Sequence, residues 1–379
     1  APAVAVVPPL VLPGADFAQW VYRALVLLVI SCPCALMVSI PLGYFGGLGG
    51  ASRRGILIKG ANFLEALTRL HTVVFDKTGT LTRGVFRVTE VVAKNGYHRN
   101  EVLKLAAAAE SHSNHPIAAS IREAYGQEVA AGVVKDYQEI AGQGIKARVE
   151  GRLVLAGNDR LLHRENVPHD VCDVEGTVVY VAVDGVLAGY IIIADEVKRD
   201  AAETVAGLKR LGVKKIVMLT GDDETPARHV AATLGIETCF AQLLPEEKVV
   251  RVEELQASIP EPRRDKLAFV GDGINDAPAI TRADVGVAMG GLGADAAIEA
   301  ADVVIMDDRP AKLVTAVRLA RRTRRIILQN IALALGVKGF FVILGTLGVA
   351  TIWEAVFADV GVALAAVLNA TRTLGIPKT

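Results

Sequence analysis

The segment that most constrains the fold of this 379-residue chain is a short apolar run that ends in an aspartate and a glycine-containing turn. Thr72–Phe75 has the β-branched and aromatic composition of a buried strand, and Asp76–Thr82 continues it with the sequence DKTGTLT. In an open α/β sheet, ligands bind at the carboxyl ends of parallel strands, where the N–H groups of tight turns attract anions. The segment therefore predicts a parallel α/β sheet that presents Asp76 to an anionic ligand.

The composition indicates that part of the chain lies in a membrane. Hydrophobic residues make up 52% of the sequence, and the mean hydropathy of +0.39 is high for a purely soluble enzyme. The formal net charge is zero, so charge balance gives no reason to expect a nucleic-acid partner. Four cysteines are too few and too unevenly placed for a secreted disulfide scaffold, which favours a reduced, cytoplasmic setting for the soluble part.

An uncharged stretch near the amino terminus predicts a membrane helix. Ala24–Ser52 contains no Asp, Glu, Lys or Arg, and about 20 apolar residues suffice to cross a bilayer. We expect a transmembrane helix over about Phe17–Tyr44, and we expect residues 1–13 to be the end of another, truncated one. The alternative is a soluble α/β protein with buried helices, which the length of the uncharged stretch disfavours.

Two apolar stretches near the carboxyl terminus each contain a single charge. Ile326–Trp353 contains Lys338, and Ala355–Thr371 contains Asp359. At ~1.5 Å per residue, Lys338 lies ~18 Å into a helix that begins near Ile326, close to the middle of a bilayer. Charges inside membrane spans are costly and are candidates for function, and these two are expected to meet.

Basic residues flank the predicted spans on one side, whereas the opposite connections carry only Asp16 and Glu354. This asymmetry predicts that the large middle region lies in the cytoplasm of a multi-pass protein of the plasma membrane. The flanking basic residues are Arg53, Arg54, Lys59, Arg321, Arg322, Arg324 and Arg325, with Arg372 and Lys378 at the end of the chain.

The middle region predicts a split α/β domain with an inserted α+β lobe. Strands and helices alternate after residue 188, starting with a strand at Gly189–Ile193, which is the pattern of a doubly wound sheet. The expected divisions are a helix end at 1–13, a membrane helix with a cytoplasmic extension at 14–72, the first part of the doubly wound domain at 73–83, the inserted lobe at 84–188, the second part at 189–320, and two membrane helices at 321–379.

Three further polar motifs follow predicted strands or begin predicted helices. A threonine hydroxyl and a lysine are suited to contact phosphoryl oxygens, and a carboxylate is suited to hold Mg²⁺. The motifs are Thr220-Gly221-Asp222, Lys248 within LPEEK, and Asp272 with Asn275 and Asp276 within GDGIND.

Taken together, DKTGTLT, TGD and GDGIND in this order resemble the phosphorylation domain of P-type ATPases, which has a haloacid-dehalogenase-like fold. The resemblance implies that Asp76 becomes phosphorylated and that Asp76, the Thr78 carbonyl and Asp272 hold Mg²⁺. It gives catalytic roles to Lys77, Thr78, Thr220, Gly221, Asp222, Lys248, Asn275 and Asp276.

Thr78 separates this chain from soluble phosphatases that resemble it in fold. Those enzymes carry a second aspartate two residues after the nucleophile, which serves as general acid and base. Without such a base, hydrolysis of an acyl phosphate at Asp76 should be slow, and the intermediate should persist. This pattern disfavours a membrane-tethered phosphatase.

The inserted lobe resembles the nucleotide pocket of heavy-metal P-type ATPases. The motif ESHSNHP contains Glu110 and His115, and the resemblance places His115 against adenine; His112 receives no role. Glycines at Gly142, Gly144 and Gly157, with Asn158, are expected to let the backbone approach ATP.

The predicted first span contains Ser31-Cys32-Pro33-Cys34, in which proline breaks the helix and frees backbone polar groups. CPC followed by DKTGTLT resembles the heavy-metal branch, and Lys338 with Asp359 resembles its zinc, cadmium and lead exporting group. Two thiolates, one carboxylate and one ammonium sum to a charge that one divalent ion neutralises, which favours Zn²⁺, Cd²⁺ or Pb²⁺ over Cu⁺. A structural Lys338–Asp359 pair is compatible with this role.

The predicted function is ATP-driven export of these ions, with Asp76 phosphorylated. A Cu⁺ exporter, a membrane-tethered phosphatase and a non-catalytic metal-binding membrane protein are the alternatives. The lipid bilayer, ATP and the metal ions are the expected partners. Because no Thr-Gly-Glu motif occurs, the chain is expected to be the carboxyl-terminal part of a longer pump and not to complete the cycle alone.

Overall fold

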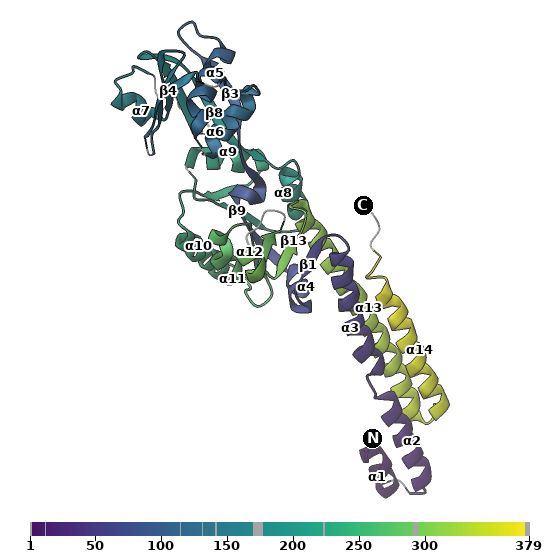
Figure 1. Cartoon of the computed structure of the whole chain (residues 1–379). Helices are drawn as coiled ribbons and strands as arrows, with labels where there is room; N and C mark the ends of the chain where they lie inside the picture. Colours follow the sequence, from purple (N-terminus) through teal and green to yellow (C-terminus); the bar gives the residue numbers. More distant parts are fainter. Residues whose placement is uncertain are drawn as a thin grey trace.

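Two β-sheets and a group of long helices make up the chain in the computed structural model (Figure 1). The structure describes residues 2–11, 13–113, 115–130, 132–140, 142–169, 177–222, 224–290 and 295–375. One sheet carries the DKTGTLT segment, and the other forms the lobe that is inserted after it. The long helices extend away from the first sheet on the side opposite the inserted lobe (Figure 1).

The first sheet has seven strands, and Asp76 ends its fifth strand in spatial order. Neighbouring strands are parallel except for the edge pair β1 and β13. Its order is β1 (Ile56–Ile58), β13 (Val303–Ile305), β12 (Val285–Met289), β11 (Lys266–Gly271), β2 (Leu70–Asp76), β9 (Lys215–Leu219) and β10 (Thr238–Phe240).

Helices cover both faces of this sheet because the strand side chains alternate. Phe75 packs in the core with Leu64 and Leu208, whereas the adjacent Val74 packs on the other face with Val252 and Ile280. The first face is covered by α4 (Ala61–Leu67), α8 (Ala201–Arg210), α9 (Glu224–Leu234) and the start of α13 (Ala311–Leu347), and the second by α10 (Pro245–Ala257), α11 (Ala277–Arg282) and α12 (Asp295–Ala300). The predicted doubly wound α/β fold is confirmed.

The inserted lobe is an antiparallel sheet of six strands covered by helices. Its order is β3 (Thr82–Ala93), β8 (Val186–Val197), β7 (Thr177–Val183), β6 (Arg152–Gly157), β5 (Gly144–Val149) and β4 (Val134–Ile140). Its helices are α5 (Arg99–Ala109), α6 (Pro116–Tyr125) and α7 (Asp159–Arg164). The predicted α+β character of this lobe is confirmed.

One predicted strand belongs to a different sheet. Gly189–Ile193 was expected to begin the second part of the doubly wound domain, but it lies within β8 and pairs antiparallel with both β3 and β7. The expected boundary at 188/189 is therefore wrong, and the six-stranded sheet runs from Thr82 to Val197. An isolated apolar run does not reveal its pairing partner, since both sheets bury such strands.

Three helical segments are long and apolar enough to cross a membrane: Phe17–Ser52, Ala311–Leu347 and Ile352–Thr371. Helices α3 (Cys34–Ser52), α13 and α14 (Ile352–Thr371) run side by side, and α1 (Pro2–Val11) and α2 (Phe17–Ile30) lie at the far end (Figure 1). Their outer surface is apolar, with Trp353 81% and Phe357 82% exposed. Such a surface is suited to lipid rather than to water.

The first predicted span is broken at the proline, as the sequence indicates. Helix α2 ends at Ile30 and α3 begins at Cys34, and the second helix reaches Ser52 instead of ending near the expected Tyr44. The turn between the last two spans lies after Leu347 and before Ile352.

Candidate active site

Four charged side chains meet at the carboxyl edge of the seven-stranded sheet. Lys248, in the first turn of α10, places its Nζ 2.5 Å from Oδ1 of Asp76 and 2.8 Å from Oδ1 of Asp276. The carboxylate of Asp272 completes the group, since one oxygen each of Asp76, Asp272 and Asp276 lie within 4.8 Å of one another. Residues from the DKTGTLT, LPEEK and GDGIND motifs thus lie together in the structure.

The site concentrates negative charge in a buried place. Burial, followed by the nearby Asp276, raises the pKa of Asp76 to about 7, although Lys248 opposes this shift. Burial and Asp276 also raise the pKa of Asp272 to about 6. Burial lowers the pKa of Lys248, but the carboxylates of Asp76 and Asp276 outweigh it and raise that pKa above its usual value. A further cation in the site would relieve this repulsion between carboxylates.

Gly79 allows Asp272 to approach the DKTGTLT turn. Its φ of +72° lies in the left-handed region, and a Cβ built on it would lie 1.6 Å from Oδ2 of Asp272. Lys198, which is buried, donates a hydrogen bond to the Gly79 carbonyl and lies 3.6 Å from Oδ2 of Asp308. Lys198 therefore fixes the turn that packs against Asp272.

The Thr220-Gly221-Asp222 turn is tied to the same segment by an ion pair between Lys77 and Asp222. Thr220 is buried, and its Oγ1 accepts a hydrogen bond from the backbone N–H of Asp222 at 3.1 Å. The turn follows β9, which pairs directly with β2. Adjacent parallel strands thus bring Thr220 to the edge that carries Asp76.

The carboxylate group fits a Mg²⁺ ion by its chemistry. Mg²⁺ prefers oxygen ligands and takes few of them from protein, and three carboxylates share this site. Thr78 is exposed on the turn, and Asn275 is exposed in the short 3₁₀ turn that leads to Asp276. The structure thus places Thr78 and Asn275 at the margin of the carboxylate group, while Asp272 and Asp276 belong to it.

A cavity with a volume of about 250 Å³ lies in the inserted lobe. The cavity is lined by all six residues that were expected to bind nucleotide: Glu110, His115, Gly142, Gly144, Gly157 and Asn158. The wall also contains Ser113, Glu139 and Thr177, which the sequence did not single out.

Glycine and asparagine residues shape the wall of the cavity in the inserted lobe. A Cβ on Gly144 would lie 2.3 Å from the Ala156 carbonyl oxygen, so only glycine permits this strand approach. Asn158 donates from Nδ2 to the Gly142 carbonyl at 2.9 Å and so joins two of the predicted segments. Burial raises the pKa of Glu110 to about 7, which leaves this carboxyl partly protonated near neutral pH.

A third group lies between the long helices, at the break between α2 and α3. Nζ of Lys338 lies 2.7 Å from Oδ1 of Asp359, and it also donates to the carbonyls of Ile30 and Cys32. Cys32 and Cys34 are joined by a disulfide. The carbonyls freed by the proline are thus satisfied by Lys338, and thiolate ligation would require the reduced cysteines.

Three hydrogen bonds at the DKTGTLT turn and the residues after it were not predicted. Thr82 donates from Oγ1 to Asp195, whose other oxygen accepts from the Val85 N–H at 3.2 Å, and Lys198 follows three residues later. The signal was the charged stretch DEVKRD, whose first three residues are the last three of β8. Its partners lie more than a hundred residues away, so only the tertiary structure identifies them.

Comparisons with known proteins agree with this geometry. Residues 70–284 match the family model of haloacid dehalogenase-like hydrolases. A zinc-transporting ATPase of Synechocystis sp. is 65% identical over 98% of this chain and 51% of its own length. A zinc/cadmium/lead-transporting P-type ATPase of Escherichia coli (strain K12) is 42% identical over 98% of this chain and 50% of its own length.

The fold agrees as well. A crystal structure of a zinc-transporting PIB-type ATPase in an E2.Pi state superposes with a TM-score of 0.86 at 41% identity, covering 98% of this chain and 61% of that one. The chain spans about half the length of the curated relatives it matches.

The seven-stranded sheet and the family match show that the chain belongs to the haloacid dehalogenase-like hydrolases. Within that family, the chain belongs to the heavy-metal P-type ATPases, as the sequence motifs predicted.

Proposed function

We propose that this chain provides the catalytic domains and part of the ion pathway of an ATP-driven exporter of Zn²⁺, Cd²⁺ or Pb²⁺. The observation that carries the proposal is the meeting of Asp76, Lys248, Asp272 and Asp276 at one sheet edge. The names of related proteins, which are zinc- and cadmium-transporting ATPases, support the choice of ions.

In the proposed reaction, an Asp76 carboxylate oxygen attacks the terminal phosphorus of ATP. The new bond joins that oxygen to phosphorus, the bond to the bridging oxygen breaks, and ADP leaves with the electron pair. Lys248, 2.5 Å from Asp76, supplies positive charge beside the transferred oxygens. Thr220, buried at the end of the neighbouring strand, would donate a hydrogen bond to one of them.

Mg²⁺, when bound, would neutralise phosphoryl charge, and Asp76, Asp272 and the Thr78 carbonyl are the proposed ligands. The chain's own contribution is to hold these groups close before the substrate arrives. Gly79 permits the approach of Asp272, and Lys198 fixes the Gly79 carbonyl.

The phosphorylated aspartate is proposed to be long-lived. The residue two positions after Asp76 is Thr78, which has no carboxylate to activate water. A persistent acyl phosphate gives time for a change in the membrane helices, as a pump requires. The same feature argues against a membrane-tethered phosphatase.

Helix α13 is proposed to carry that change to the ion site. Its first turns pack in the core of the seven-stranded sheet through Leu313 and Val317, and the same helix bears Lys338. From Leu313 to Lys338 the helix rises ~38 Å without a break. A shift of the catalytic domain would therefore move the ammonium group against Asp359 and the Cys32 carbonyl.

The ion site is proposed to consist of reduced Cys32 and Cys34 with Asp359. One hard carboxylate beside two thiolates suits Zn²⁺ or Cd²⁺ better than Cu⁺, which prefers sulfur alone. Lys338 would pair with Asp359 when the site is empty and help to expel the ion. A Cu⁺ exporter is the alternative that the same thiols would serve.

The inserted lobe is proposed to bind the adenosine part of ATP in its 250 Å³ cavity. His115 and the backbone at Gly142 and Gly144 line this cavity and offer a ring and close backbone approach. The catalytic domains would lie in the cytoplasm and the long helices in the plasma membrane, with the rest of the pump supplied by further sequence.

The decisive test is labelling of the chain by ATP that carries a radioactive terminal phosphate. An acid-stable label that disappears in Asp76→Asn and is released by hydroxylamine would support the proposal. Rapid, continuous phosphate release without a trapped label would contradict it. In the full-length pump, ATP hydrolysis should be stimulated by Zn²⁺, Cd²⁺ or Pb²⁺; stimulation by Cu⁺ alone would favour the alternative ion.

A further inference from the structure

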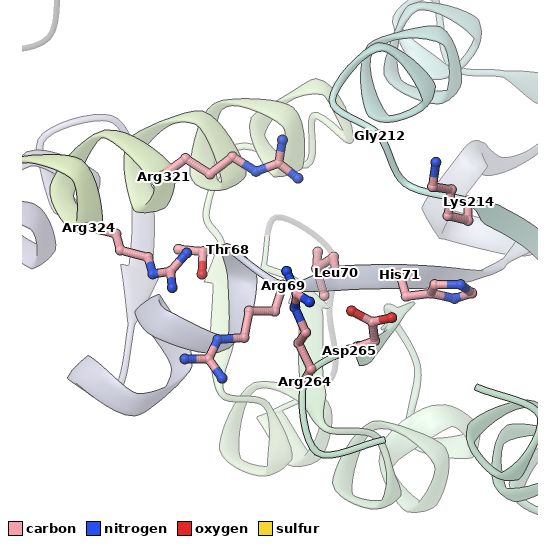
Figure 2. Close-up of a pocket in the computed structure, with 10 residues that line it drawn as sticks. All are labelled: Thr68, Arg69, Leu70, His71, Gly212, Lys214, Arg264, Asp265, Arg321 and Arg324. Carbon is pink, nitrogen blue, oxygen red and sulfur yellow. The ribbon is translucent and has the colours of Figure 1, made fainter. Parts of the chain in front are cut away.

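A basic cavity of about 410 Å³ lies at the opposite edge of the seven-stranded sheet from Asp76. Strand β2 runs between the two sites, and its seven residues separate them by ~20 Å. The cavity is lined by Thr68, Arg69, Leu70, His71, Gly212, Lys214, Arg264, Asp265, Arg321 and Arg324 (Figure 2). None of these residues takes part in the proposed phosphoryl transfer.

Positive charge exceeds negative charge around this cavity. Glu65 pairs with Arg69 at 2.9 Å and with Arg324 at 3.1 Å, and Arg264 lies 3.8 Å from Glu261. Even when these two glutamates are counted with Asp265, the wall has five cationic side chains for three carboxylates. An anionic ligand would neutralise the excess positive charge of the wall.

Two of the cations lack an acidic partner among the described residues. Arg321 donates to the Leu211 carbonyl and forms no ion pair within the described residues. Lys214 is exposed directly before β9 and forms no ion pair within the described part of the chain. Figure 2 shows Arg321 on α13 and Lys214 on the facing segment, with the cavity between them.

The position of the cavity along α13 indicates where its ligand comes from. Arg325 is the last charged residue before Lys338, so the apolar span begins near Ile326. At ~1.5 Å per residue, Arg324 lies ~3 Å and Arg321 ~7.5 Å from that point. The headgroup layer of a bilayer is roughly 5–7 Å thick on each side. The α13 wall of the cavity is therefore at headgroup depth.

We propose that this cavity binds the phosphodiester headgroup of an anionic phospholipid. Arginine guanidinium groups match phosphate oxygens in pairs, and four arginines line the wall. A zwitterionic headgroup would bring its own cationic amine among these side chains. The inference rests on the proposed membrane placement of α13 and is independent of which metal the pump exports.

The test measures lipid binding to the purified chain in micelles by native mass spectrometry. The probes are phosphatidylglycerol, phosphatidylcholine and inorganic phosphate. The variant Lys214→Gln/Arg321→Gln removes two charges without leaving a described carboxylate unpaired. The matched control Arg318→Gln/Arg325→Gln removes two exposed charges from α13, one turn on either side of Arg321.

We expect the cavity variant to lose roughly tenfold or more of its affinity for phosphatidylglycerol, and the control to lose clearly less. Equal losses in both variants would show diffuse attraction to charged lipid and overturn the proposal. Equal binding of phosphatidylcholine, or displacement of the lipid by inorganic phosphate, would overturn it as well.

Lys214→Gln alone provides a readout that does not depend on tolerance of the Arg321 change. Lys214 is exposed, so this variant should fold with an unchanged thermal midpoint. It should still lose several-fold in phosphatidylglycerol affinity. Diffuse attraction would instead make Arg325→Gln the more damaging single change, because Arg325 lies nearest the apolar span. The ATP-labelling reaction is not part of this test, so the two proposals fail separately.

Discussion

Nζ of Lys338 lies 2.7 Å from Oδ1 of Asp359, inside the group of long apolar helices. The same ammonium reaches the carbonyls of Ile30 and Cys32 that the proline break leaves free. One lysine thus links α13 to α14, to the last residue of α2 and to the break itself. Both members of the pair are largely buried, with side-chain exposures of 14% and 17%.

Removing one partner of this pair should therefore be costly. We expect Lys338→Ala to lower the free energy of unfolding by on the order of 3 kcal/mol, because Asp359 is left buried without its partner. The double variant Lys338→Ala/Asp359→Ala should recover part of that loss. Thermal unfolding in micelles measures both, and additive losses would show that the two side chains are not coupled.

A methyl group on Gly79 should displace Asp272. Gly79→Ala places its Cβ 1.6 Å from the Asp272 carboxylate, so we expect loss of phosphorylation and weaker Mg²⁺ binding. Gly84→Ala is the matched control: its φ of +66° imposes a similar strain of ~1–2 kcal/mol, but the nearest atom lies 3.7 Å away. Similar labelling by ATP in both variants would contradict the role given to Gly79.

The carboxylate group should make stability depend on pH and on Mg²⁺. The ordinary pKa of an aspartate is about 3.8, and the fold raises that of Asp76 to about 7 and that of Asp272 to about 6. At pH values between about 4 and about 7, the folded state thus binds more protons than the unfolded state. The free energy of unfolding therefore falls as the pH rises through this range.

Mg²⁺ should reverse this loss, because it binds the ionised carboxylates. We expect a larger rise of the melting temperature with Mg²⁺ at pH 8 than at pH 5.5. Asp272→Asn should reduce the difference. A rise of equal size at both pH values would show that Mg²⁺ binds elsewhere.

Lys198 should act by positioning the turn rather than by contacting the substrate. It donates to the Gly79 carbonyl, so Lys198→Ala should weaken Mg²⁺ binding about tenfold. This is the lower end of the usual range for loss of a residue that supports a metal site. Lys198→Arg should restore part of the affinity. Arg199→Ala changes the neighbouring exposed residue and should have little effect. Titration with Mg²⁺ by calorimetry distinguishes these cases.

The sequence predicted which side chains lie together at the sheet edge because short motifs determine which groups follow which strands. Asp76, Thr220 and Asp272 each stand directly after an apolar β run, and parallel strands end at a common edge. The six residues that the family resemblance assigned to nucleotide binding all line one cavity. The ion pair of Lys338 and Asp359 followed from two isolated charges at matching depth.

Only the tertiary structure assigned β8 to the six-stranded sheet, brought Lys198 to Gly79, and closed the basic cavity from four separate segments. The sequence determined local strands, the helix break at Pro33 and the residue types at each strand end, because these depend on near neighbours along the chain. Strand partners and contacts across more than a hundred residues depend on how the packed layers come together, which no local pattern encodes.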